Sequence, residues 1–430
     1  MTETTRGQAA HAQTVEVSPW AIVVVGMLAL AAAMGIGRFA FTPLLPMMLN
    51  DGVIDLAGAS WLASANYLGH LLGALLCTFQ PWIWRRFPVL LPVAASTWAR
   101  AGLVATCAFT LGMALHLPWL WPVLRFAAGV ASAFVFVFTS GWCLEQLAAR
   151  NAGALGAAIY AGPGAGIVLS GLLASGMVAV GWSASSGWLT FGVLAIILTA
   201  MVWQTFHQRA EKKEALVVTS VGAGGAAASP ENFRQQASRQ EMLVFALAYG
   251  LAGFGYIITA TFLPVIARQA LPLSALLDMF WPLFGVGVVV GALLSSRISL
   301  AGDLRHWLAG CYVVQALAIA VSIVIPTLTG FALSSLLLGL PFTAITFFAM
   351  QEARRLRPLT AHAYMGLLTA MFGLGQIAGP PMVAVLLRRA PSLAAGFTLS
   401  LEIAAASLLL GVVVYLWMTR VWPVRPRVAG

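Results

Sequence analysis

The stretch GHLLGALL at residues 69–76 returns as GVVVGALL at residues 287–294, a displacement of 218 positions in a chain of 430. The same displacement carries GIGRF at residues 35–39 onto GFGYI at residues 253–257. Two apolar segments that repeat in register half a chain apart are typical of membrane proteins built from two related halves around a central site. The repeat therefore predicts two homologous halves.

The composition places the chain in a lipid bilayer. Hydrophobic residues make up 60% of the sequence, charged residues only 8%, and the mean hydropathy is +0.91. Soluble domains carry about a quarter charged residues. Because a bilayer-crossing helix needs about 20 apolar residues, the length allows roughly twelve crossings, six in each half.

Hydropathy predicts an all-α membrane protein with two pseudo-symmetric six-helix bundles. The expected helices are residues 20–48, 60–80, 88–113, 119–144, 152–178 and 183–206 in the first half, and residues 241–266, 273–295, 306–326, 328–351, 362–387 and 393–418 in the second. The expected organisation is an N-terminal tail (1–18), a first bundle (19–206), a polar linker (207–240), a second bundle (241–419) and a C-terminal tail (420–430).

The distribution of basic residues predicts the orientation. Of 23 basic residues, 17 lie in the loops and tails on one side, three lie on the other, and Arg38, Arg100 and Arg125 fall inside predicted helices. Basic residues concentrate on the cytoplasmic side. We expect a multi-pass protein of the bacterial inner membrane with both termini and the linker in the cytoplasm. This arrangement explains the net charge of +10 without a nucleic-acid partner.

The sequence offers little for an enzyme or a metal site. Four cysteines lie in apolar segments without metal-ligand or disulfide spacing. No phosphate-binding loop with its lysine, zinc-protease motif or serine nucleophile turn is present. We expect no cofactor, no metal and no enzymatic activity. A polytopic membrane enzyme or a sensor remains a remote alternative.

Arginines inside membrane helices are the sharpest candidates for function. A charge in the hydrocarbon region costs at least about 2.5 kcal/mol, so it usually faces a cavity or a partner. Arg38 lies in a glycine-rich segment, and its repeat mate is the neutral Tyr256, so the halves differ at this position. The alternative is that an arginine such as Arg38 or Arg125 holds neighbouring helices through their carbonyl groups.

Three short stretches of the first half form a recognisable pattern: GIGRF at residues 35–39, TPLLP at residues 42–46 and LASANYLG at residues 62–69. With them the chain resembles the major facilitator superfamily, and more narrowly its YbfB/YjiJ-like branch. This resemblance implies that the first and fourth helices of each half line a central cavity and that the second and fifth form a rocking interface. On that basis Arg38 and Arg125 are expected on the cavity wall.

Two further motifs are similar to those of proton-linked members. RFAAG at residues 125–129 resembles a fourth-helix arginine-to-glycine motif, and GPGAG at residues 162–166 resembles the glycine-proline motif of drug–proton antiporters. Residues 162–166 are equally consistent with a plain kink or a tight packing surface.

Candidates for proton coupling are His70, Arg125 and Glu402, because coupling needs a group that changes charge. The alternatives are a neutral His70 bonded between helices and a structural Glu402. Neutral polar residues at membrane depth could orient a solute by hydrogen bonds or could only bridge helices. Those chosen as substrate-binding candidates beside Arg38 and Arg125 are Tyr160, Tyr256, Thr42 and Asn66.

These features together predict a secondary active transporter. Two cavity arginines without a central acid favour a small organic anion or carboxylate as the substrate, because a guanidinium pairs well with that group. One co-transported proton would cancel the electrical cost of moving a monoanion inward. We therefore expect proton symport by a monomer, and the alternative is proton-driven export of drug-like or lipophilic compounds.

Overall fold

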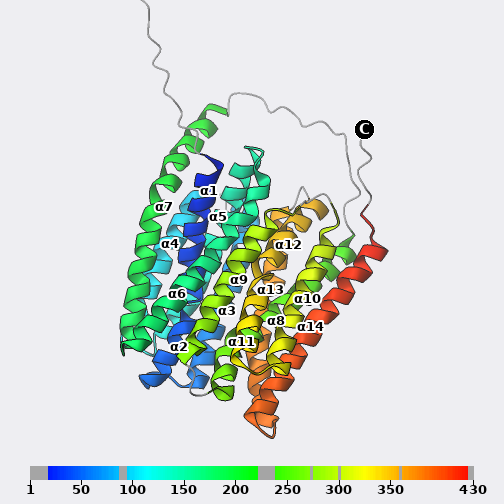
Figure 1. Cartoon of the computed structure of the whole chain (residues 1–430). Coiled ribbons are helices and arrows are strands. Elements are labelled where there is room, and N and C mark those ends of the chain that lie inside the picture. The colour runs from blue at the N-terminus through cyan, green and yellow to red at the C-terminus, as the bar shows by residue number, and fades with distance from the viewer. Residues whose placement is uncertain are drawn as a thin grey trace, which may run out of the picture.

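The computed structural model describes residues 18–86, 94–220, 238–271, 275–298, 302–357 and 361–424. Every regular element in these ranges is helical, and the elements form two bundles side by side (Figure 1). α1 begins and α14 ends at the same end of the molecule, here called the terminal side (Figure 1).

Each half contributes six crossings. The first half comprises α1 (Pro19–Leu30), η1 (Ala31–Arg38), α2 (Phe41–Asn50), α3 (Leu56–Arg86), α4 (Ala95–Gly112), α5 (Trp121–Ala148), η2 (Gly153–Tyr160), α6 (Ala161–Ala179) and α7 (Ala184–Ser220). The second half comprises α8 (Arg239–Ala270), η3 (Ala275–Met279), α9 (Phe280–Ser295), α10 (Leu304–Val324), α11 (Leu328–Gly339), α12 (Phe342–Leu356), α13 (Ala361–Arg389) and α14 (Leu393–Val421).

The number of crossings agrees with the sequence. Within the described ranges, ten crossings are long and apolar enough to span a bilayer. The 18-residue α4 completes the first half, and η3 with the apolar α9 completes the second. The predicted fold class, an all-α membrane protein of two six-helix bundles, is confirmed.

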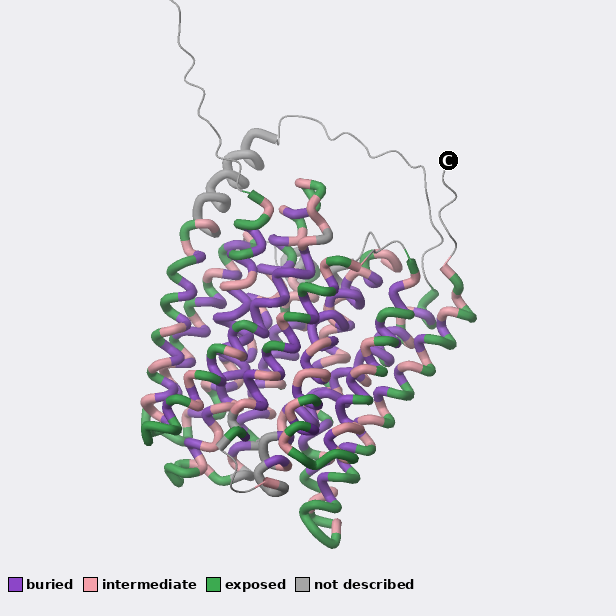
Figure 2. Tube along the Cα trace, viewed as in Figure 1, coloured by how far each residue is buried: buried purple, intermediate pink, exposed green. Residues whose placement is uncertain are grey.

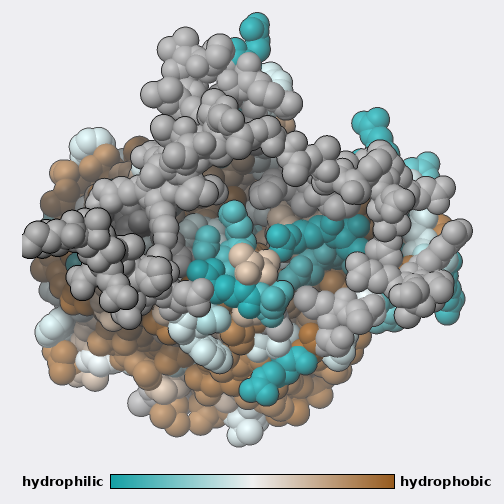
Figure 3. All heavy atoms as spheres, turned by 90° about the horizontal axis from the view of Figure 1, so that it is seen from above, coloured by the Kyte–Doolittle hydropathy of each residue, from teal (hydrophilic) through white to brown (hydrophobic). Residues whose placement is uncertain are grey.

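Burial separates inner from outer helices. In the most apolar window of residues 19–50, 72% of positions are buried, against 33% in α14. Figure 2 shows buried positions concentrated in the middle of the bundles and exposed ones on the outer helices. Seen from the terminal side, hydrophilic residues gather near the centre and hydrophobic residues form the flanks (Figure 3). This distribution suits a protein surrounded by lipid.

The repeated glycines are explained by helix crossings. A Cβ at Gly69 in α3 would collide with the backbone carbonyl of Phe126 in α5. A Cβ at its repeat mate, Gly287 in α9, would collide with the carbonyl of Leu336 in α11. Small residues let membrane helices approach closely. The repeat therefore preserves the same close contact between the second and fourth membrane-spanning helices in both halves.

The halves meet through two helix pairs, α3 with α13 and α6 with α9. Each pair joins the second crossing of one half to the fifth crossing of the other, as the family resemblance implies. The two pairs are equivalent under the repeat that relates the halves. A Cβ at Gly164 in α6 would lie 2.8 Å from the carbonyl oxygen of Gly285 in α9. Gly166 instead faces Gly35 in its own half. The glycine-rich α6 thus packs against α9 of the other half on one side and against the first crossing of its own half on the other.

The first crossing is not one continuous helix. Residues 31–38 form a π-helix, in which the Phe39 amide donates to the Met34 carbonyl at 3.1 Å. Pro43 and Pro46 follow in α2, and neither can donate a backbone hydrogen bond. The small residues of this stretch let other helices approach the break. The first crossing, expected as one helix over residues 20–48, is therefore interrupted by a π-helical segment just before its prolines.

Several other boundaries differ from the sequence expectation, and two of these differences change how a crossing is built or where it ends. The tenth crossing, expected at 328–351, is split into α11 and α12 because Pro341 lacks an amide hydrogen and ends the first helix. The sixth crossing, α7, continues to Ser220, so helix extends into the range expected for the linker. Residues 221–237 of that linker, and most of both expected tails, lie outside the described residues.

Candidate functional site

A cavity lies between the halves, bordered by residues from the middle of the crossings toward the terminal side. The first half contributes Met34, Arg38, Phe39, His70, Phe136, Tyr160 and Pro163. The second half contributes Tyr249, Tyr256, Phe342, Thr343, Thr346, Met350, Thr369, Phe372 and Gln376. The cavity volume is ≈ 50 Å³, enough for a few water molecules.

Arg38 places a positive charge in this cavity. Its side chain is buried, with one guanidinium nitrogen donating to Gln376 Oε1 at 2.6 Å, while Nε has no partner in the described part of the chain. The guanidinium packs over the rings of Phe39 and Tyr67 at 5.4 and 5.5 Å. Among the described residues, the ion pairs lie elsewhere and none involves Arg38. A buried guanidinium with an open donor and no counter-ion can pair with an anion.

Tyr256 extends the polar end of the cavity. Gln376 Nε2 donates to the Tyr256 hydroxyl, so the hydroxyl hydrogen is left to donate to another group. Arg38 and Tyr256 are repeat mates, and Gln376 joins them. The two repeat mates, although they differ in charge, thus belong to one hydrogen-bonded polar cluster of Arg38, Gln376 and Tyr256.

His70 is held in one tautomer by Ser132. His70 Nδ1 lies 3.1 Å from Ser132 Oγ, and this hydroxyl donates to the Gly129 carbonyl at 2.8 Å. Because the hydroxyl hydrogen is directed to Gly129, the oxygen accepts from Nδ1–H. The proton is therefore assigned to Nδ1, and Nε2 is the nitrogen that can accept another proton.

Arg125 has a different environment from Arg38. It is 3% exposed but does not border the cavity. Its guanidinium donates to the carbonyls of Gly37 at 3.3 Å and Arg38 at 3.1 Å and packs over Phe41 at 4.9 Å. These carbonyls lie at the π-helical break, where regular helical bonding is interrupted. Arg125 therefore stabilises the segment that presents Arg38.

Three other predicted site residues also lie outside the cavity lining. Asn66 is buried and donates to the carbonyl of Arg125 at 2.9 Å, so it joins α3 to α5. Thr42 is half-buried in α2. Glu402 is exposed on the outer surface of α14, because that helix turns its other face to α8 and α10. A coupling role for Glu402 disagrees with this placement.

The structure thus brings together four of the predicted residues: Arg38, His70, Tyr160 and Tyr256. Gln376, which joins two of them, was one of the neutral polar residues at membrane depth that the sequence offered, but it was not chosen for the predicted site. Phe136 and Phe372 could not have been distinguished from ordinary core aromatics by sequence.

Aromatic rings close the cavity on the side away from the termini. Phe39 of the first half packs edge-on against Trp281 and Phe342 of the second, with ring centroids 6.2 Å apart in both pairs. Phe284 stacks on Trp281 at 5.3 Å and meets Phe342 at 5.6 Å. Each of these four residues is at least nine-tenths buried. These rings fill the space between the two halves on that side.

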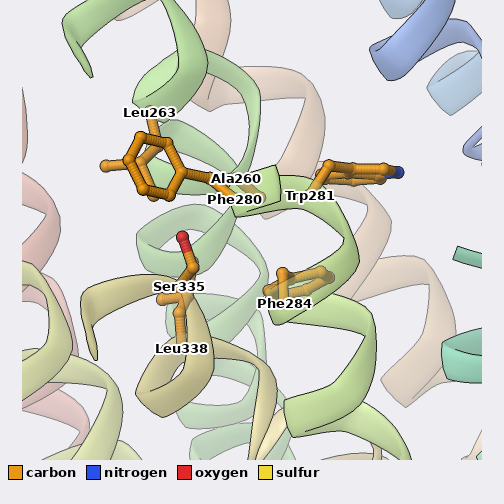
Figure 4. Close-up of a pocket in the computed structure, with 7 residues that line it drawn as sticks. All are labelled: Ala260, Leu263, Phe280, Trp281, Phe284, Ser335 and Leu338. Atoms are coloured by element: carbon orange, nitrogen blue, oxygen red, sulfur yellow. The ribbon is translucent and has the colours of Figure 1, made fainter. Parts of the chain in front are cut away.

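A smaller void of ≈ 10 Å³ lies behind this closure, within the second half. Figure 4 shows Phe280, Leu263 and Ser335 around it, with the ring of Trp281 pointing away from them. A void of this volume holds at most about one water molecule. It is too small for an organic solute.

A charged cluster ties the helix ends of the second half together at the terminal side. Arg305 is 1% exposed and pairs with Asp303 at 2.8 Å and Glu241 at 3.4 Å. It also donates to the carbonyl of Trp422 at 2.6 Å. Burial opposes ionisation of Asp303, but the hydrogen bonds and charge of Arg305 outweigh it, so the pKa of Asp303 lies below its usual value.

The described residues contain no group of three or more His, Cys, Asp or Glu side chains that could hold a metal ion. Two six-helix halves around a cavity with a buried arginine define a membrane transporter of the major facilitator type. The chain belongs to the family described as "Uncharacterised MFS-type transporter YbfB", which matches residues 30–416. It is thus a transporter rather than an enzyme.

Solved structures with the same fold include a nucleoside transporter and an organic anion transporter. The crystal structure of a mutant of the nucleoside transporter NupG has a TM-score of 0.61 at 14% identity, covering 92% of this chain and 99% of that one. The human organic anion transporter MFSD10 (TETRAN) has a TM-score of 0.62 at 14% identity, covering 92% and 98%. At this identity both show the fold alone. A search of curated proteins finds no match.

Proposed function

We propose that this transporter carries a small organic anion bearing a carboxylate, by alternating access and in symport with a proton. The observation that carries the proposal is Arg38, a buried cation that borders the central cavity without a counter-ion in the described chain. A carboxylate bound there would gain charge-assisted hydrogen bonds to the guanidinium and a further bond from the Tyr256 hydroxyl. It would also neutralise a charge that is costly at membrane depth.

The proton site in this proposal is His70 Nε2. His70 borders the same cavity as Arg38 and is oriented by Ser132. Protonation of His70 beside Arg38 alone would place two positive charges in one buried cavity. A bound anion compensates for that charge, so proton and anion favour each other's binding. For a monoanion, one co-transported proton removes an electrical cost of about 2.3 kcal/mol per 100 mV.

The orientation proposed is that of a bacterial inner-membrane protein with both termini in the cytoplasm. The support is the excess of basic residues on that side, 17 against three. The terminal side would then be cytoplasmic, and the described conformation would face inward. Since the cavity is enclosed by the two halves of one chain, a monomer suffices for transport.

Uptake into proteoliposomes tests the proposal. Vesicles containing the purified protein should accumulate radiolabelled monocarboxylates when an inward proton gradient is imposed, and dissipation of the gradient with a protonophore should abolish accumulation. Protein-free vesicles measure passive entry of the protonated acids.

The competing function is proton-driven export of lipophilic compounds, which the aromatic lining and the glycine-proline segment of α6 favour. Extrusion of a lipophilic cation from the same vesicles, with no carboxylate accumulated, would replace our proposal with this one.

A further inference from the structure

We infer that the transported anion has a planar aromatic body and a single negative charge. This inference rests on the proposed function, because it specifies which organic anions the cavity at Arg38 accepts. It goes beyond that function by assigning two opposed aromatic walls to the body of the substrate.

The second half supplies one wall. Tyr256 stacks on Phe372 with ring centroids 5.6 Å apart and an angle of 18° between the rings. Tyr249 lies against the same Phe372 at 5.0 Å, and Phe342 meets Tyr256 at 4.8 Å. All four residues border the cavity. They form a continuous aromatic surface that begins beside the polar cluster of Arg38 and runs toward the terminal side.

The first half supplies the other wall. Phe136 lies 5.9 Å from Tyr160 and 6.4 Å from the His70 ring, measured between centroids. These three residues come from α5, η2 and α3 and border the same cavity. A flat ring between the two walls can stack on aromatic surfaces from both halves. An aliphatic body of equal size gains the apolar contact without that stacking.

The permanent charge of the site favours a monoanion, because Arg38 is a permanent cation, whereas His70 carries a positive charge only while the transported proton is bound. Among the described residues that border the cavity, Arg38 is the only arginine or lysine, and none is an aspartate or glutamate. The guanidinium of Arg125, which is also buried in the first half, donates to backbone carbonyls. A second carboxylate would therefore be buried without a fixed cation. An amino acid would place its ammonium group near Arg38 with no acidic partner.

The location of the walls also connects binding to movement. The ≈ 50 Å³ cavity is smaller than the roughly 150 Å³ that accommodates benzene in an engineered core cavity. Because the walls belong to different halves, separation of the halves can supply the remaining space. A ring that contacts both walls then binds with different affinity when the halves are close together and when they are apart. This difference in affinity is what allows a substrate to shift the equilibrium between the two conformations.

A matched ligand series tests the inference by equilibrium binding to the purified full chain. We expect benzoate to bind about tenfold more tightly than cyclohexanecarboxylate, which has equal charge but a puckered ring, because stacking on two faces contributes about this factor. Phthalate, a dianion, and benzamide, a neutral amide, should bind at least tenfold more weakly than benzoate.

Two variants on one helix provide the structural control. Phe136→Leu removes one of the two stacking faces and should reduce the preference for benzoate over cyclohexanecarboxylate from about tenfold to about threefold. Phe134→Leu should preserve it, since Phe134 packs on Trp98 at 5.3 Å and does not border the cavity. Phe372→Leu tests the opposite wall in case Phe136→Leu fails to fold, as judged by size-exclusion chromatography.

Equal binding of benzoate and cyclohexanecarboxylate would refute the inference that the substrate stacks on the aromatic walls. Tight binding of phthalate would refute the inference that the substrate carries a single negative charge. Either result leaves anion transport intact. If no carboxylate binds in the series, or in the uptake assay, the proposed function itself fails.

Discussion

Replacing Arg38 with glutamine should abolish substrate binding while leaving the protein folded. Glutamine retains a polar head near Gln376 but removes the cation and the guanidinium donor that has no partner in the described chain. Two hydrogen bonds to a carboxylate, each worth about 1.5–3 kcal/mol when a charged group is involved, amount to about 3–6 kcal/mol. Affinity should therefore fall by about 10²–10⁴-fold.

The stability of this variant should change little. Loss of the Arg38–Gln376 hydrogen bond costs about 1.5–3 kcal/mol, and removal of a buried charge without a counter-ion offsets it. The assays are equilibrium binding and proton-driven uptake of a monocarboxylate, with unfolding followed by thermal shift in detergent. Arg100→Gln is the matched control, because Arg100 packs over Trp203 at 4.6 Å and does not border the cavity.

Two results would refute this reasoning. Unchanged binding in Arg38→Gln would show that the substrate does not contact the guanidinium. Loss of folded protein in Arg38→Gln but not in Arg100→Gln would assign Arg38 to structure.

Three further predictions concern coupling, rocking and the charged cluster. His70→Gln should remove the stimulation of uptake by an inward proton gradient while substrate exchange at equal pH persists; retained stimulation would exclude His70. Gly164→Ala should slow uptake at least tenfold without unfolding either half, since the new Cβ would lie 2.8 Å from the Gly285 carbonyl oxygen and push α6 from α9; wild-type uptake would contradict this. Asp303→Asn should lower the free energy of unfolding by about 3 kcal/mol at neutral pH by leaving Arg305 with a weaker partner, measured as detergent thermal stability. Because the pKa of Asp303 is lowered on folding, the stability it provides is present above its usual pKa and is lost as the pH falls through the folded value, so wild type and variant should converge in acid.

The architecture could be predicted from the sequence because its causes are local and repeated. Gly69 and Gly287 mark the same close helix–helix contact in both halves. Long apolar runs mark the helices that span the membrane. The break at residues 31–38 could not be predicted from the sequence, because whether a glycine-rich helix kinks or becomes π-helical depends on the helices packed against it.

The residues that border the candidate cavity could be predicted only in part from the sequence, and Arg38 and Arg125 show why. Arg38 and Arg125 look alike in the sequence, since each is a lone charge in an apolar helix. Only the π-helical break provides the carbonyls of Gly37 and Arg38 that accept from Arg125. Likewise, the rotation of α14 decides that Glu402 faces outward, and hydropathy does not report that rotation.

The central claim, that an anion binds at Arg38, is tested most directly by a thermal-shift screen of wild type and Arg38→Gln against monocarboxylates, sugars, amino acids and lipophilic cations. A ligand at 100 times its dissociation constant stabilises the folded state by about 2.7 kcal/mol. We predict that monocarboxylates raise the unfolding temperature of wild type and leave that of Arg38→Gln unchanged. Stabilisation by a sugar or a cation but by no acid, or equal stabilisation of both proteins by an acid, would contradict the claim.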